Sequence, residues 1–434
     1  MRCARAGRAG AAQRGPAGRP GPRAYGGAVS GRASLLTILA VVLVALNLGG
    51  AIAAVPPVLE DLQAAVGLTP AQAALMTSLP VLLFALAAPL AARLGRRLGP
   101  GRAVLVGLAL IAVGTLVRVL GGPLVLLLGT AVVGLGITVG NVLVPVVIKR
   151  DFAGRASRVT GFFTATLAVG AALTSALTVP LAQLMGWRAA LALWAVLVPV
   201  AVVGWVRHVV RRERDGAGEP ARPHTPVPAG VHEDRFVWRL PTAWALAVAL
   251  GSQSALYYSL TTWLPTILVD RAGVTHAVGG TAMALYQITA IPTALTIAGF
   301  ARMRPRQGWI GVLIALAWTV MVAGLLLAPA AWPVWAVVGG LAQGAGFTYA
   351  LTLIVLRGHD EHVVRALNAM AQLVGYTIGA AGPFAVGWLA QSTGGWGAPG
   401  LLLVALALSL ATSSLAAGRD VVVRAPSGRG PDPS

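Results

Sequence analysis

The sequence predicts an all-α membrane protein with twelve transmembrane helices arranged as two six-helix bundles. Three observations predict this fold class. First, 57% of the 434 residues are hydrophobic and only 11% are charged, against about 25% charged in an ordinary soluble domain. Second, the chain contains twelve apolar runs, each long enough to cross a bilayer. Third, lysine and arginine are concentrated in every second loop, as in polytopic membrane proteins.

Windows of about 20 apolar residues locate the helices. The first six are expected near 34–58, 71–92, 103–121, 123–148, 158–184 and 189–206. The second six are expected near 241–269, 277–300, 309–328, 332–356, 366–391 and 399–417. The predicted domains are a disordered basic cytoplasmic tail 1–33, an N-terminal bundle 34–206, a cytoplasmic linker 207–239, a C-terminal bundle 240–417 and a cytoplasmic tail 418–434. An over-extended gene model is an alternative reading of the first tail.

The distribution of basic residues predicts the orientation. Of 33 lysine and arginine residues, all but Arg118, Arg188 and Arg271 lie in the two tails, the linker and alternate loops. This distribution places both termini and the linker in the cytoplasm of a multi-pass protein of the cell (inner) membrane. It also accounts for the net charge of +20 without nucleic acid. We expect a monomer whose partners are a small-molecule solute and the lipid bilayer.

The run QSALYYSLTTWLP, residues 253–265, carries many hydrogen-bonding groups inside an uncharged segment that reaches from Pro241 to Val269. At about 100° per residue, Gln253, Tyr257 and Tyr258 share one half of the helix with neighbouring hydroxyl residues. Unpaired amides and hydroxyls are costly in lipid. We therefore expect this half to face a water-filled cavity or a solute. The alternative is that these groups join helices by hydrogen bonds.

Other predicted spans also carry isolated polar residues. Asn368, Gln372 and Tyr376 are spaced i, i+4, i+8, which aligns them on one helix face. Prolines inside several spans are candidate bends near a cavity. The predicted substrate-binding residues are Asn47, Asn141, Gln253, Tyr257, Tyr258, Gln287, Gln343, Gln372 and Tyr376.

Catalysis, cofactors and resident metals are not indicated. All acidic residues and histidines lie in tails, loops or span ends, so no residue is suited to carry protons in mid-membrane. The run HDEH at 359–362 has ligand-type residues, but in a loop it reads as a solvated charge run. We expect no enzyme, no cofactor and no metal. A membrane-embedded enzyme or sensor is kept as the alternative of another class.

Several runs in the same order resemble the major facilitator superfamily, and within it the cyanate and 2-nitroimidazole transporter-like family. The resemblance covers residues 40 to 417 and rests on ALNL (45–48), TSLPVLLFALAAP (77–89), NVLVPVVIKRDF (141–152), GWRAALALW (186–194), QSALYYSLTTWLP (253–265) and AQLVGYTIGAAGP (371–383). It implies two parallel six-helix repeats and a secondary active or facilitative transporter that works by alternating access.

The chain departs from the family pattern at two places. AARLGRRLG has Ala92 where an acidic residue is usual, which puts the family's charge latch between helices in doubt. The family's Asn-Leu-Arg reads here Asn47-Leu48-Gly49, so the cation that suits a small anion is lost. We therefore expect a small neutral polar or heteroaromatic solute, with a cyanate-type anion as the alternative.

Overall fold

The computed structural model describes residues 31–152, 155–214, 233–302 and 306–424. In these ranges the chain is helical apart from turns, short connections and one isolated β-bridge between Gly358 and Val423. Most of the predicted tails lies outside the described residues. The two ends of the predicted linker are helical, because α8 reaches Arg214 and a 3₁₀ turn covers Glu233–Arg239, while the residues between them are not described.

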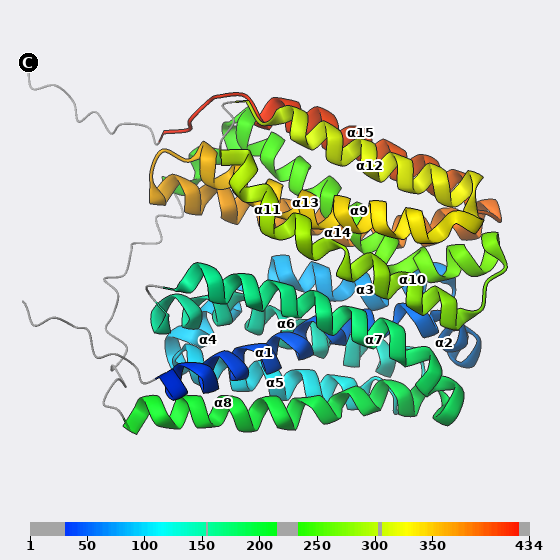
Figure 1. Ribbon diagram of the computed structural model, residues 1–434, viewed down its shortest axis with the longest axis horizontal. Coiled ribbons are helices and arrows are strands. Elements are labelled where there is room, and N and C mark those ends of the chain that lie inside the picture. Colours follow the sequence, from blue (N-terminus) through cyan, green and yellow to red (C-terminus); the bar gives the residue numbers. More distant parts are fainter. Residues whose placement is uncertain (1–30, 153–154, 215–232, 303–305, 425–434) are drawn as a thin grey trace, which may run out of the picture.

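In the described residues of the first half, the chain forms eight α-helices, which Figure 1 labels. They are α1 (Gly31–Ala53), α2 (Leu59–Val66), α3 (Pro70–Leu86), α4 (Ala88–Leu98), α5 (Pro100–Val117), α6 (Pro123–Asp151), α7 (Ala156–Leu193) and α8 (Leu197–Arg214). A short 3₁₀ turn, η1 (Pro56–Val58), precedes α2. Helices α3 and α4 meet at an angle of 59°. Helix α7 is interrupted at Gly186, whose φ of 81° is the left-handed conformation that glycine adopts without strain.

The second half contains seven helices. They are α9 (Pro241–Ala272), α10 (His276–Ile288), α11 (Ala290–Arg302), α12 (Gly308–Leu327), α13 (Trp332–Arg357), α14 (Glu361–Thr393) and α15 (Gly397–Ala417). Of the prolines in the predicted spans, Pro80, Pro145, Pro265 and Pro383 each lie inside one helix, whereas Pro56 and Pro57 lie in the 3₁₀ turn that follows α1.

The twelve predicted spans map onto these helices. In the described part of the chain, nine segments are long and apolar enough to cross a membrane, or ten if the bent α3–α4 pair is one span. One of the nine, Arg158–Arg214, contains the predicted fifth and sixth spans, which meet at Gly186. The seventh span, α9, is absent from the nine because its polar side chains lower its hydropathy. With these two cases resolved, the fold is the predicted twelve-helix one.

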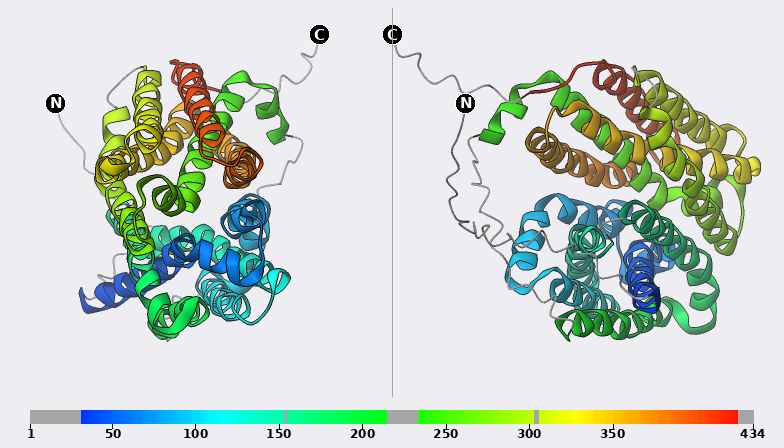
Figure 2. Two further views of the ribbon diagram at one scale, coloured as in Figure 1. Left: turned by 90° about the vertical axis from the view of Figure 1, so that its right-hand side faces the viewer. Right: turned by 60° about the vertical axis from the view of Figure 1, so that its left-hand side comes forward.

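The helices form two bundles, one from each half of the chain (Figures 1 and 2). Helix α14 packs against α3 and α9, and α10 packs against α7, so two helix pairs join the bundles. Helices α1 and α9 begin, and α8 and α15 end, on the left of Figure 1. We call this the basic end, because the arginine-rich loops lie there.

Close contacts between the bundles are found at the end away from the basic loops. A Cβ on Gly280 of α10 would lie 2.6 Å from the Ser175 carbonyl oxygen of α7, and one on Gly387 of α14 would lie 3.0 Å from the Pro70 carbonyl oxygen of α3. Glu60 Oε2 and His276 Nε2 lie 3.6 Å apart across the same end, where they form an ion pair when the imidazole is protonated. The two halves therefore meet backbone to backbone there.

Candidate functional site

Aromatic side chains from both bundles meet where α3, α9, α13 and α14 come together. Phe84 of α3 and Tyr376 of α14 form an edge-to-face pair with ring centroids 5.9 Å apart. Phe347 of α13 stacks on Tyr376 at 6.5 Å, and the rings of Tyr257 and Tyr258 on α9 lie 4.6 Å apart. We call these five residues the interface cluster. The tyrosines of α9 and α14 and Phe84 belong to one packed group, so the cluster spans the boundary between the bundles.

The interface cluster lies at mid-height. Helices α9 and α14 have 32 and 33 residues, which makes each about 48–50 Å long at 1.5 Å per residue. Tyr257 and Tyr376 are close to the midpoints of these helices. Transporters of this fold class bind solutes near the bilayer midplane at the repeat interface, and the cluster occupies that level.

Amide side chains extend from the cluster into the second bundle. The Trp318 indole nitrogen donates to Gln253 Oε1 at 3.0 Å. Gln253 Nε2 donates to the Gln343 carbonyl oxygen at 3.4 Å, and Gln343 Nε2 donates to Gln287 Oε1 at 3.0 Å. Tyr286, next to Gln287, stacks on Tyr257 at 6.5 Å. Four helices, α9, α10, α12 and α13, thus contribute to one polar group beside the rings.

Several polar atoms of this group have no partner. Tyr286 Oη, Gln287 Nε2, Gln343 Oε1 and Thr261 Oγ1 are buried, and none of them makes a hydrogen bond of good geometry among the described residues, although Thr261 lies beside both Tyr257 and Tyr286. The Tyr257 hydroxyl lies near Gln287 and Thr261. Buried polar atoms nearly always have a hydrogen-bond partner. A concentration of unpaired ones beside aromatic rings indicates a place where a polar ligand or water binds.

The structure brings six of the nine predicted site residues together. These are Gln253, Tyr257, Tyr258, Gln287, Gln343 and Tyr376. Gln253 has no exposed surface, so it supports the site from behind.

The other three lie apart from this group. Asn47 is buried between α1 and α8, where it donates to the Leu43 and Leu197 carbonyl oxygens. Asn141 is exposed on α6. Gln372 is partly buried and donates to Asn368 on its own helix at 3.0 Å.

Sequence reasoning did not select four residues that the structure places in the site. Trp318 and Tyr286 are fully buried, and their aromatic side chains in apolar spans look like ordinary packing residues. Phe84 and Phe347 carry no polar atom, so nothing in the sequence separates them from phenylalanines that face lipid. For Tyr286 a signal was available, because it directly precedes Gln287 in a span with few other polar groups.

The run HDEH at 359–362 has a structural role at the basic end. Asp360 accepts a hydrogen bond of 2.9 Å from the Val363 amide and so caps α14. This hydrogen bond lowers the pKa of the Asp360 carboxyl. Within the described ranges, no three His, Cys, Asp or Glu residues are grouped so that they could hold a metal ion.

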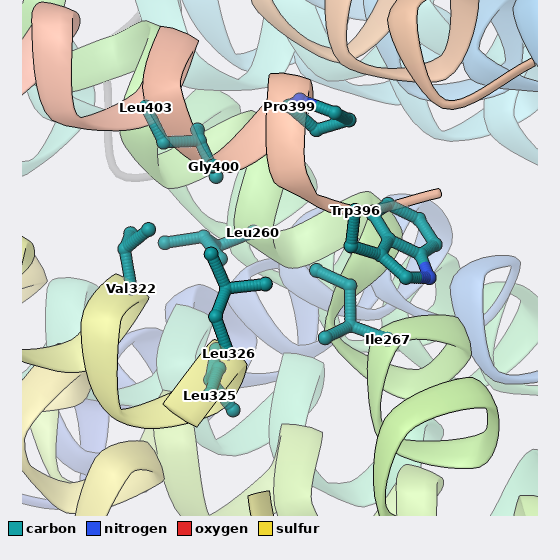
Figure 3. A pocket seen from close by; sticks show the side chains of 9 residues that line it. All are labelled: Leu260, Ile267, Val322, Leu325, Leu326, Trp396, Pro399, Gly400 and Leu403. Carbon is teal, nitrogen blue, oxygen red and sulfur yellow. The ribbon is translucent and has the colours of Figure 1, made fainter. Parts of the chain in front are cut away.

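A separate small cavity lies between α9, α12 and α15 (Figure 3). Its volume is about 10 Å³, and its lining is apolar, with Leu260, Val322 and Leu403 among the contributors. A water molecule needs about this much space but also two or more polar partners. The cavity is therefore a packing defect of the second bundle, separate from the candidate site.

Comparison with known sequences identifies relatives along most of the chain. The family model of the Major Facilitator Superfamily matches residues 37–380. The 2-nitroimidazole transporter of Escherichia coli (strain K12) is 35% identical over 397 residues, which are 91% of this chain and 98% of that protein. The cyanate transport protein CynX of the same strain is 32% identical over 362 residues, which are 83% of this chain and 91% of that protein.

Solved structures share the fold at low sequence identity. The nucleoside transporter NupG superposes with a TM-score of 0.71 at 12% identity, covering 88% of this chain and 99% of that chain. A bacterial homolog of the human lysosomal transporter Spinster, in an inward-facing and unoccupied conformation, gives 0.64 at 17% identity, covering 89% and 94%. At these identities the likeness shows the twelve-helix architecture alone.

Proposed function

Because this chain belongs to the major facilitator superfamily and is a small-solute transporter, we propose that its solute is a neutral, planar, polar molecule bound at the interface cluster. The carrier is secondary active or facilitative, and the two bundles expose the site to each side in turn. The observation that carries the proposal is the composition of the site. Rings, amides and hydroxyls meet at mid-height, and none of the site side chains named above is charged.

Aromatic faces and amide groups suit a flat heterocycle. Rings of Tyr257, Phe347 and Tyr376 offer surfaces on which a planar solute stacks, while unpaired amide and hydroxyl atoms offer hydrogen bonds at its edge. A relative 35% identical to this chain is named a 2-nitroimidazole transporter. That name supports a heteroaromatic solute here.

A small anion is the second candidate, because another relative is named a cyanate transport protein. The geometry around Gly49 disfavours it. A Cβ at Gly49 would lie 2.0 Å from the Leu167 carbonyl oxygen of α7, so this position contacts a neighbouring backbone and has no room for a cation. Arg118 is buried at the far end of α5 and donates to the Ala51 carbonyl oxygen at 3.2 Å. Its Nε and Nη2 atoms make no hydrogen bond among the described residues, but its place at the end of α5 keeps this cation away from the mid-height site.

Reconstituted flux tests this proposal. Purified protein in liposomes is expected to move 2-nitroimidazole saturably and to release it chemically unchanged, while cyanate moves no faster than through protein-free liposomes. Saturable cyanate flux without 2-nitroimidazole flux would assign the anion instead. Chemical conversion of the solute would assign an enzyme.

We also infer that the basic end faces the cytoplasm, with both termini on that side, because the loops and helix ends that the structure describes there are rich in lysine and arginine. Single cysteines at exposed positions test this in a Cys3→Ser background. Ala65→Cys, in α2 at the opposite end, is expected to react with an impermeant thiol reagent in intact cells. Arg214→Cys, at the end of α8, is expected to react only after permeabilisation. The reverse pattern overturns the orientation.

A further inference from the structure

We infer that Gln287 and Gln343 form an open amide pair that recognises a hydrogen-bond donor and a neighbouring acceptor on the edge of the solute. The inference rests on the proposed function and deepens it. It selects planar neutral heterocycles in which a ring N–H stands beside a carbonyl oxygen, a nitro oxygen or a ring nitrogen.

The pair is joined by one hydrogen bond where two are possible. Gln343 Nε2 donates to Gln287 Oε1 at 3.0 Å. Gln287 Nε2 and Gln343 Oε1 make no hydrogen bond of good geometry among the described residues, and the Tyr257 hydroxyl is the polar group that lies beside Gln287. An amide carries two N–H donors and one acceptor oxygen. If both side-chain amides are rotated by 180°, Gln287 Nε2 donates to Gln343 Oε1. Gln343 Nε2 and Gln287 Oε1 are then the free donor and the free acceptor. The pattern therefore holds for either orientation of the two amides.

Burial makes these free atoms selective. Gln287 is 1% exposed, and the unpaired atoms of both glutamines are buried. In a site built to form hydrogen bonds, a ligand that lacks the matching group leaves buried atoms unpaired and is rejected strongly. Gln343 as a whole is only partly buried, so a solute that lies on the Tyr257 ring can approach the pair.

Neighbouring contacts hold the pair in place. The Gln343 carbonyl oxygen accepts from Gln253, which Trp318 anchors. Gln287 is one residue from the end of α10, where α11 begins after Thr289. Gly340 and Gly344 allow the junction between α10 and α11 to pack closely against α13. A Cβ on Gly340 would lie 1.9 Å from Thr289 Oγ1, and one on Gly344 would lie 1.9 Å from the Ala290 carbonyl oxygen. Fixed amides present the donor and the acceptor before the solute arrives.

Methylation of the solute tests the inference. The probes are 2-nitroimidazole and 1-methyl-2-nitroimidazole, which share the ring and the nitro group and differ in the N–H donor. Saturable flux of both is measured in proteoliposomes, and the ratio of the two kcat/KM values is compared between proteins. Because each ratio comes from one preparation, it does not depend on the amount of folded protein. Wild type is expected to favour the unmethylated solute by about tenfold or more.

The double variant Gln287→Met/Gln343→Met is expected to bring this ratio close to one. Because both glutamines are replaced, no buried amide is left without its hydrogen-bond partner. The melting temperature of the double variant is measured beside the flux. Gln391→Leu, at an exposed position near the end of α14, is the control and is expected to keep the wild-type ratio. Saturable flux of both solutes with a wild-type ratio near one overturns the inference alone. An unchanged ratio in the double variant also overturns it. Absence of saturable flux for both solutes overturns the proposed function.

Discussion

The indole nitrogen of Trp318 on α12 donates a 3.0 Å hydrogen bond to Gln253 Oε1 on α9, and both side chains are fully buried. Gln253 also lies against Gly346, where a Cβ would come within 2.0 Å of its side-chain oxygen. Three helices are thus joined behind the interface cluster. On the proposed function, we expect Gln253 to affect the solute through this support.

Substitution at this contact is expected to lower stability together with transport. Gln253→Leu leaves the Trp318 N–H unpaired, which costs about 1–3 kcal/mol. Trp318→Phe leaves the Gln253 oxygen unpaired at a similar cost. The double variant is expected to lose less than the sum, by about 0.5–2 kcal/mol. Unfolding in detergent measures all three. Additive losses would show that the two side chains are not coupled.

The ring of Tyr376 is expected to matter more for transport than its hydroxyl group does. It is partly exposed and holds Phe84 and Phe347 by ring contacts, each worth about 0.5–1.5 kcal/mol. Tyr376→Leu is expected to reduce kcat/KM for 2-nitroimidazole about tenfold, and Tyr376→Phe to retain most of it. The melting temperature of Tyr376→Phe, which keeps both ring contacts, is expected to stay near that of wild type, while Tyr376→Leu is expected to lose about what the two ring contacts contribute. Full activity of Tyr376→Leu would remove the ring from the site.

Gly49 is expected to tolerate no side chain. A Cβ there would meet the Leu167 carbonyl oxygen at 2.0 Å, so Gly49→Ala is expected to destabilise the first bundle by about 1–3 kcal/mol. Gly299→Ala is the matched control, because this helical glycine of α11 has nothing within 4 Å of the added carbon. Its melting temperature is expected to be unchanged or slightly raised. Equal melting temperatures for the two variants would refute the close α1–α7 contact.

The Glu60–His276 pair is expected to hold the bundles together at the end away from the basic loops. Both side chains are partly exposed, so the pair is worth about 1 kcal/mol or less. His276→Ala is expected to raise the labelling rate of Ser175→Cys, a buried position beneath Gly280, by up to about fivefold. Labelling of Ala65→Cys, which is already exposed, serves as the reference. An unchanged labelling rate of Ser175→Cys would show that the Glu60–His276 pair does not help to hold the bundles together at this end.

The fold could be predicted from sequence because each span is marked by length, by apolar composition and by the side on which its basic residues fall. The breaks were harder to predict. Proline was the expected signal, yet Pro145 and Pro265 lie in continuous helices. Inside the predicted spans, the chain is interrupted at Ala87 and at Thr289, and only the interruption at Pro56–Val58 contains proline. Neighbouring helices can stabilise a proline inside a span, so the residue type alone does not locate a kink.

The site was only partly predictable. The spacing of Gln253, Tyr257 and Thr261 indicates one polar face, and in the structure the side chains near it are amides and rings from α10, α12 and α13. The middle of helix α9 is buried on every side. The distribution of polar residues around this helix therefore does not show which side faces the solute. Asn47 and Gln253 are both single amide residues in apolar spans, so the sequence does not distinguish them. In the structure, Asn47 donates to a carbonyl oxygen on α8, whereas Gln253 lies behind the interface cluster and accepts from Trp318.

Counterflow of labelled 2-nitroimidazole into proteoliposomes tests the central claim most directly. Vesicles containing the purified protein and preloaded with the unlabelled solute are expected to accumulate the label transiently, because a carrier that alternates between two sides exchanges bound solute. The label recovered from the vesicles is expected to be unmodified. Wild-type vesicles that accumulate no more label than protein-free vesicles, at solute concentrations up to the solubility limit, would contradict the account.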